Sequence, residues 1–290
     1  MRCRLTVLAL VFAVAAVPAL AQSGAPPLRD STVAVHMRDG GLLVGRITEQ
    51  SVDSIGVVTA SGRMTLARSA IVEIAAVNTN DVHEGVYWPT DPHDTRLFFG
   101  PTGRVLGKKN CYFSDLYLFL VNVACGVTDR LMLGGGMSLF PSSDFLGNNL
   151  YYLTPKVALV QREAFNVSVG ALVGFAGHTA GSSGMLYAAA TNGRPDLSFT
   201  YGVGYVYSQD KITSDALLMF GGNARISRRV SLMSENYIFT GRSGGYFLPI
   251  YGVRLIGDKL STDLGFVNFF GRDVAGIFPG LPWVGMAIKF

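Results

Sequence analysis

Most of the chain is a succession of segments in which apolar and polar positions alternate. In 165–175 the odd-numbered positions are apolar, and the even-numbered positions are small or polar except for Leu172. In 197–207, aromatic and aliphatic residues again alternate with serine, threonine and glycine over most of the segment. Because successive side chains of a strand point to opposite faces, such a segment predicts a β-strand with one apolar face.

Turn residues divide the chain beyond residue 94 into about twelve such strands, and the connections between them alternate in length. Short connections, as at 163–164 and 257–258, alternate with longer ones, as at 141–149 and 272–280. Short periplasmic turns and longer external loops are typical of transmembrane barrels. The first segment contains Pro101, so ten strands remain an alternative. The predicted strands are 94–104, 110–126, 129–140, 150–162, 165–177, 183–191, 197–207, 214–226, 229–240, 245–256, 259–271 and 281–290.

The N-terminal segment has the three parts of a secretory signal peptide. Arg2 and Arg4 precede the apolar stretch 5–16, and Ala19-Leu20-Ala21 has the small-x-small pattern of a cleavage site. We therefore predict a signal peptide over 1–21. Residues 22–30, rich in proline, glycine and alanine, predict a linker.

A separate β module is predicted over 31–82, where short apolar strands are joined by glycine turns at 39–41 and 61–62. The run Val35-His36-Met37-Arg38-Asp39-Gly40, followed by Gly45-Arg46-Ile47 and by the segment 69–74, resembles the Sm-like and SH3-like small barrels. The Arg-Gly pair of the second RNA-contacting motif of the Sm family is missing. The resemblance implies a small SH3-like β-barrel, which we expect to be a periplasmic module with a protein partner. Residues 83–93 predict a second linker.

The C-terminal strand is similar to the assembly signal of outer-membrane β-barrel proteins, Gly-x-x-apolar-x-aromatic. Gly285, Ile288 and Phe290 occupy the three defined positions, and Trp283 stands where a polar residue is usual. The resemblance covers about two-thirds of the chain. It implies an all-β fold, an antiparallel transmembrane barrel over 94–290, in contact with outer-membrane lipid. It also implies recognition of the C-terminal strand by the barrel-assembly machinery.

The amino-acid composition is consistent with a protein whose surface is largely not exposed to water. Charged residues make up 15% of the 290 residues and apolar residues 49%, whereas soluble domains have about 25% charged residues. Without Arg2 and Arg4, basic and acidic residues are nearly balanced. We therefore expect no nucleic-acid partner, and we identify no cofactor.

The alternation also predicts which polar side chains face the lumen. A charge facing lipid at mid-depth would cost roughly 2–4 kcal/mol. Two interpretations remain open: a narrow polar path that favours anions, and an internal salt-bridge network that plugs a small barrel. The segment around Glu235 alternates poorly, so the direction of this side chain is not predicted. The lumen-facing candidates are Lys156, Asp215, Asn223, Arg225, Arg254 and Asp263.

Candidate catalytic and metal residues are few. His178 lies in a serine-containing loop, but the sequence has no Gly-x-Ser-x-Gly elbow and no evident third partner for a triad. His93 has no partner at metal-ligand spacing. Cys111 and Cys125 fall in one predicted strand, about 46 Å apart at about 3.3 Å per residue, so we expect no disulfide between them.

These features favour a non-enzymatic structural or interaction protein of the outer membrane, with residues 31–82 in the periplasm. The alternative is a small passive channel or a transporter of apolar ligands, whose conductance would change on substitution of Lys156 or Arg254. An envelope hydrolase dependent on His178 is a third and weaker hypothesis.

Overall fold

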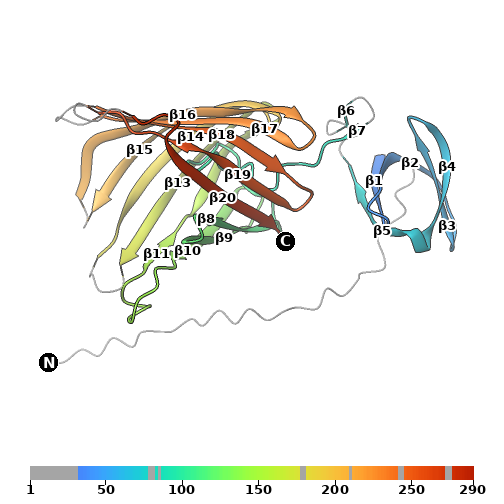
Figure 1. The fold of residues 1–290 in the computed structure, drawn as a ribbon, viewed down its shortest axis with the longest axis horizontal. Coiled ribbons are helices and arrows are strands. Elements are labelled where there is room, and N and C mark those ends of the chain that lie inside the picture. Colours follow the sequence, from blue (N-terminus) through green and yellow to red (C-terminus); the bar gives the residue numbers. More distant parts are fainter. Residues whose placement is uncertain are drawn as a thin grey trace. The chain divides into compact units, whose positions relative to one another are not determined.

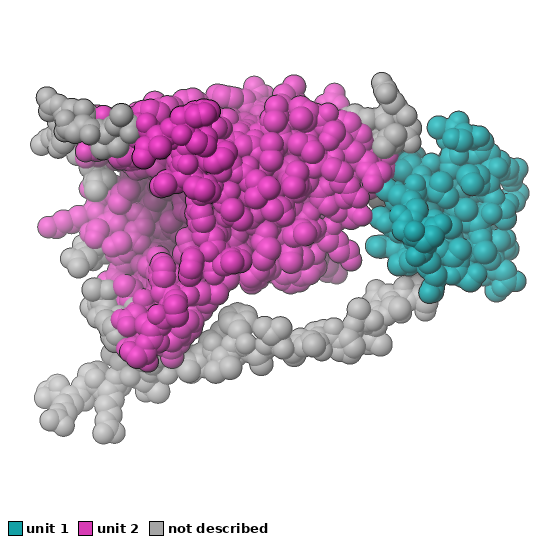
Figure 2. All heavy atoms as spheres, in the orientation of Figure 1, with its two compact units in different colours: residues 1–85 teal, residues 86–290 magenta. Residues whose placement is uncertain are grey.

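A computed structural model of the chain describes residues 32–77, 82–83, 86–176, 181–208, 211–240, 245–271 and 276–290 (Figure 1). The predicted signal peptide and the linker at 22–30 lie outside the described residues. The chain divides into two compact units, 1–85 and 86–290 (Figure 2). In the described part, no helix is long and apolar enough to span a membrane.

The first unit is a five-stranded antiparallel sheet with the order β4-β3-β2-β1-β5. One 3-10 helix, η1 (Arg68–Ala70), separates its last two strands. The strands are β1 (Thr32–Met37), β2 (Leu42–Gln50), β3 (Ser54–Thr59), β4 (Gly62–Ala67) and β5 (Ile71–Ala76).

This sheet is strongly bent around a small core of its own. Val33, Ile47 and Val57 are among its fully buried side chains. A side chain at Gly45 would lie 2.4 Å from the carbonyl oxygen of Val58, so glycine permits the close approach of β2 and β3. Turns occur at both predicted glycine positions, and Gly40 has a φ of 85°. Membership of the SH3-like class remains a prediction.

The second unit is a closed antiparallel barrel of twelve strands, as predicted. Every strand pairs with two neighbours, and β20 closes the barrel on β8. Two short segments, β6 (Val82–His83) and β7 (Val86–Tyr87), precede it in the chain. β11 and β12 form one strand that is interrupted at 154–155. The strands are β8 (Cys111–Leu116), β9 (Leu120–Gly126), β10 (Leu131–Ser138), β11 (Leu150–Leu153), β12 (Lys156–Arg162), β13 (Phe165–Ala176), β14 (Ser183–Arg194), β15 (Leu197–Ser208), β16 (Lys211–Ser227), β17 (Val230–Phe239), β18 (Tyr246–Ile256), β19 (Leu260–Val267) and β20 (Leu281–Lys289).

Two of the predicted strands were wrong, and the errors cancel in the count. Residues 94–104 form no strand of the barrel wall, and 110–126 is a hairpin of two strands, β8 and β9. The hairpin turns at 117–119, where Tyr117 and Leu118 have φ values of 56° and 63°. This turn contains no glycine, proline or asparagine, so the usual turn signals were absent.

The hairpin also overturns the expectation for the cysteines. Cys111 and Cys125 are opposite one another in the register of β8 and β9. Their Cα atoms are 4.2 Å apart, and a disulfide joins them. The expectation failed because it placed both residues on one extended strand.

The two ends of the barrel differ in their connections. At the short-turn end, the links at 163–164, 195–196 and 228–229 are two residues long. At the long-loop end, 139–149 and 268–280 are the longest links. β8 starts and β20 ends at the short-turn end, as twelve antiparallel strands require.

Candidate functional site

The lumen contains a segment of the chain itself, residues 89–106, which we call the plug. Its tip is a tight hairpin, in which Leu97 N–H donates to Gly100 O (2.9 Å) and Thr102 N–H donates to Thr95 O (3.0 Å). Further along, Gly103 N–H donates to the Thr191 hydroxyl at 2.8 Å. The first predicted strand thus makes its backbone hydrogen bonds within itself and with the inner wall.

Arg254 of β18 is the main polar anchor of the plug. Its guanidinium donates to Asp263 of β19 at 2.6 and 2.9 Å and to Asp91 Oδ2 at 2.8 Å. It also donates to the carbonyl oxygens of His93 (2.9 Å) and Leu97 (2.7 Å). Arg254 is 2% exposed and Asp263 is 1% exposed. A buried cation with this many partners fixes the plug against the wall.

Glu235 of β17 is a second anchor, and its direction was not predicted. It is fully buried, and its carboxylate accepts the backbone N–H groups of Phe99 and Gly100, both at 3.0 Å. The Tyr237 hydroxyl donates to the same carboxylate. A Cβ atom at Gly100 would lie 2.2 Å from Met219 Sδ and 2.6 Å from that hydroxyl, so both side chains would have to shift to accept one.

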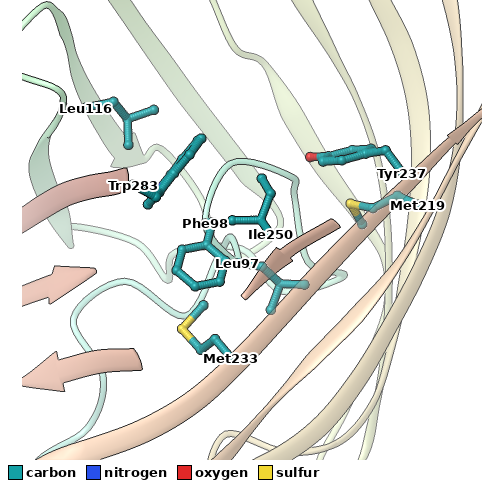
Figure 3. Packing of buried hydrophobic residues seen from close by; sticks show 8 residues of the cluster. All are labelled: Leu97, Phe98, Leu116, Met219, Met233, Tyr237, Ile250 and Trp283. Carbon is teal, nitrogen blue, oxygen red and sulfur yellow. The ribbon is translucent and has the colours of Figure 1, made fainter. Parts of the chain in front are cut away.

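Apolar contacts complete the seat of the plug (Figure 3). Leu97 and Phe98 are buried at the tip, and the Phe98 ring meets the Trp283 ring edge-on at 6.0 Å. Full burial of such side chains contributes roughly 1.5–3 kcal/mol each. The cluster comprises Leu97, Phe98, Leu116, Met219, Met233, Tyr237, Ile250 and Trp283.

The other lumen-facing candidates fall into two groups. Lys156 is 3% exposed, and its ammonium donates to Thr95 O at 2.8 Å. The Arg225 guanidinium donates to Asp196 Oδ1 (3.0 Å) and to Pro89 O (2.8 Å). Lys156, Arg225, Arg254 and Asp263 are therefore brought together around the plug.

Asn223 is linked to the plug indirectly, through Ser198. Asn223 accepts the Ser198 hydroxyl at 2.6 Å, and the same hydroxyl accepts Nη1 of Arg104, a plug residue, at 3.4 Å. Asp215 is exposed in the long-loop half of β16.

Sequence reasoning missed Glu235 and the plug residues Asp91, His93 and Arg104. One signal could have found the plug: residues 91–96 include two aspartates, a histidine and an arginine, a density unsuited to a lipid-facing strand. Asp91 and His93, which fall in the predicted linker 83–93, belong to the plug anchor.

Burial shifts the pKa values of two titratable groups in the plug. Desolvation lowers the pKa of His93 well below its ordinary value, and nearby Arg96 and Arg254 add to the effect. A neutral His93 can accept a hydrogen bond, and the Arg96 Nε–H donates to its Nε2 atom. Burial raises the pKa of Asp94, against the influence of Arg104.

A cavity of about 670 Å³ lies between the plug tip and the long-loop half of the wall, and we call it the chamber. Leu172, the exception in the alternation of 165–175, lines it. Its charged lining residues are Arg96 and Lys156, and no described acidic residue lines it. Most of its lining is aliphatic or aromatic. The lining includes Phe99, Tyr112, Leu116, Leu120, Met132, Leu150, Tyr152, Leu172, Met185, Tyr187, Val206 and Leu217.

The structure does not test the hypothesis of a hydrolase dependent on His178. His178 lies outside the described residues. Among the described residues, no group of three or more His, Cys, Asp or Glu side chains could hold a metal.

The three assembly-signal residues lie on or next to β20. Ile288 is partly exposed, on the outer face. Phe290 N–H donates to Cys111 O at 3.0 Å, in the seam between the last and first strands. At Gly285 a side chain would come within 2.8 Å of Leu116.

Among known proteins, the chain is similar to several solved structures. No protein-family model and no curated protein sequence matches the chain. A loop-deletion mutant of OmpT, an outer membrane protein of Vibrio cholerae, is 11% identical; the match covers 89% of this chain and 96% of that one, with a TM-score of 0.36. OmpF of Salmonella typhi, solved with daunomycin, is 9% identical over 90% and 96% of the two chains, with a TM-score of 0.33. The closed barrel itself is shown by the strand pairing described above, to which these distant matches add nothing.

Proposed function

We propose that this chain is an outer-membrane protein that binds an apolar small molecule in the chamber and catalyses no reaction. The observation that carries the proposal is the chamber itself, about 670 Å³ with mostly apolar walls. Ligand sites are typically concave, about 300–1,000 Å³ in volume, and apolar with a few polar groups. The chamber has these properties, and the plug forms its floor.

The outer face of the barrel supports residence in a membrane. Large apolar side chains point outward on successive strands and are exposed there, including Phe199, Leu218, Leu232, Leu255 and Leu264. Such a surface is unfavourable in water and suits contact with lipid. The predicted signal peptide and the C-terminal assembly signal agree with the outer membrane.

The N-terminal module belongs to the proposal as a periplasmic interaction module. The plug begins at Pro89, whose carbonyl oxygen accepts a hydrogen bond from the Arg225 guanidinium. The same guanidinium also donates to the carbonyl oxygen of Arg228, in the 228–229 turn. The plug therefore enters the lumen at the short-turn end. Because short turns face the periplasm in barrels of this kind, the residues that precede the plug are expected in the periplasm.

A passive channel is a weaker proposal because the plug occupies the short-turn half of the lumen. Arg254 and Glu235 hold the plug across this half of the lumen. We therefore expect no steady conductance from the wild-type protein in planar bilayers.

The direct test is ligand binding by the full chain in nanodiscs of zwitterionic lipid. The probe is N-phenyl-1-naphthylamine, an uncharged dye that fluoresces in apolar sites. Leu217 lines the chamber, while its neighbour Leu218 points outward and is 40% exposed. Leu217→Trp should fill part of the chamber and weaken dye binding, and Leu218→Trp is the matched control.

We expect saturable binding by the wild type and by Leu218→Trp, above the uptake of empty nanodiscs. Leu217→Trp should weaken it by about tenfold, as expected when overpacking excludes a ligand. The proposal fails if the wild type takes up no more dye than empty nanodiscs, or if both tryptophan variants bind equally well.

A further inference from the structure

The charges that line the chamber are of one sign. Arg96 comes from the plug and Lys156 from β12, so two separate elements place cationic side chains at the same cavity. No described acidic residue lines it. In a low-dielectric cavity, such an arrangement favours a negatively charged group.

Arg96 is not neutralised by the plug. Its Nε–H donates to the neutral His93 ring, and its buried Nη2 has no hydrogen-bond partner among the described residues. Arg254, by contrast, is paired with both Asp263 and Asp91. A buried guanidinium nitrogen without a partner costs free energy, which an anionic acceptor would recover.

Lys156 forms no ion pair with a carboxylate in the part of the chain that the structure describes. Its ammonium is buried and donates to the Thr95 carbonyl oxygen, which carries no net charge. Asp94 is close enough to influence Lys156 electrostatically, but no described ion pair joins the two. The ammonium therefore keeps donor capacity for a ligand.

The remainder of the wall is suited to a hydrocarbon chain. Leu172, Met185 and Leu217 come from three strands, β13, β14 and β16, and all line the chamber. Their side chains lie in the long-loop half of the lumen, away from the anchor at Arg254. A ligand that satisfies both regions needs a charged end and an apolar body.

We propose that the chamber binds an amphiphile with an anionic head group and an apolar chain, with the head at Arg96 and Lys156. This inference rests on the proposed function, since it names the class of ligand for the same chamber. A carboxylate or a phosphate ester would supply the head, because both accept hydrogen bonds from guanidinium and ammonium groups.

The test compares probes with one chain and different heads. Laurate, dodecyl phosphate and uncharged methyl laurate are each titrated into the full chain in zwitterionic nanodiscs, with empty nanodiscs subtracted. Displacement of N-phenyl-1-naphthylamine reports occupancy. We expect laurate or dodecyl phosphate to bind about tenfold more tightly than methyl laurate, since one charged hydrogen bond gives this preference. The stronger of the two anions identifies the head group.

Two variants test whether the preference for anionic probes arises from the cationic residues of the chamber. Arg96→Gln and Lys156→Met should each abolish most of the anion preference, measured within each variant as the ratio of anion affinity to methyl laurate affinity. Arg130→Gln, at an exposed position in the link between β9 and β10, is the control for net charge. Because Arg96 belongs to the plug and Lys156 donates to its Thr95 carbonyl oxygen, protease resistance of residues 89–106 is measured in each variant to show that the plug is still seated.

The outcomes separate the two proposals. If the uncharged dye binds saturably but the anions bind no better than methyl laurate, the head-group inference is wrong and the apolar site stands. If the anion preference persists in both variants, the head is not at Arg96 and Lys156. If no probe binds above empty nanodiscs, both proposals fail.

Discussion

Arg254 and Asp263 are opposite one another in the register of β18 and β19, and both point into the lumen. Two hydrogen bonds join the side chains, at 2.6 and 2.9 Å. The pair leaves the other guanidinium N–H groups free to hold Asp91 and two plug carbonyls. One cross-strand pair of the wall thereby positions a segment that is about 160 residues away in sequence.

Arg254→Met should loosen the plug and destabilise the barrel. Asp263 and Asp91 would become buried or partly buried carboxylates without their cation, and removal of one partner of a buried pair costs roughly 3–5 kcal/mol. We expect the variant to unfold at a lower denaturant concentration than the wild type and to conduct ions in planar bilayers. Arg229→Met removes an exposed pair with Asp258 and should change neither property. If Arg254→Met unfolds at the same denaturant concentration as the wild type and shows no conductance, Arg254 does not hold the plug.

Glu235→Gln tests the second anchor. The amide keeps one acceptor oxygen but presents an NH₂ group to either Phe99 N–H or Gly100 N–H, so one buried backbone donor loses its partner. The expected cost is roughly 1–3 kcal/mol. Hydrogen–deuterium exchange should quicken at the tip amides, with Glu163→Gln, in an exposed turn, as the control. Unchanged exchange at residues 99 and 100 would rule out this role for Glu235.

The barrel wall could be predicted from the sequence because its physical constraint is local. Lipid on one side and lumen on the other impose a period of two on every strand, and this is visible within ten residues. Leu172 broke that pattern, and it lines the apolar chamber. The alternation of 165–175 marked Leu172 as an exception but could not show that a cavity lies beside it.

The plug could not be predicted because its stability comes from distant partners. Residues 94–104 have a strand-like length and apolar content, but their hydrogen bonds go to Thr191, Glu235 and Arg254. Nothing local in the segment indicates those partners. The 117–119 turn was missed for a different reason, since Tyr117 and Leu118 adopt left-handed backbone conformations that aromatic and branched residues rarely take.

Gly103→Ala should unseat the plug where it passes β13 and β14. A Cβ atom at Gly103 would lie 2.2 Å from the Asn166 carbonyl oxygen, so the plug or the wall must move. Overpacking of this kind costs roughly 1–3 kcal/mol. We expect increased protease cleavage within residues 89–106 and measurable conductance. At Gly107, the nearest atom is 3.5 Å away, so Gly107→Ala is the matched control. Equal behaviour of the two variants would contradict the tight passage of the plug at Gly103.

The Cys111–Cys125 disulfide should stabilise the hairpin that contains the barrel seam. It joins residues that are 14 apart in sequence, and a closed loop of about 15 residues contributes roughly 3 kcal/mol by restricting the unfolded chain. We expect reductant to lower the unfolding midpoint of the full chain refolded in lipid.

The variant with both Cys111→Ser and Cys125→Ser should unfold at the same lowered midpoint and no longer respond to reductant. Because β8 carries Cys111 and pairs with β20, the loss should also speed hydrogen exchange of the Phe290 amide, which donates to Cys111 O. The β13–β14 amides lie in a different part of the wall and serve as the internal control. If reductant changes neither the midpoint nor this exchange, the disulfide has no part in holding the seam.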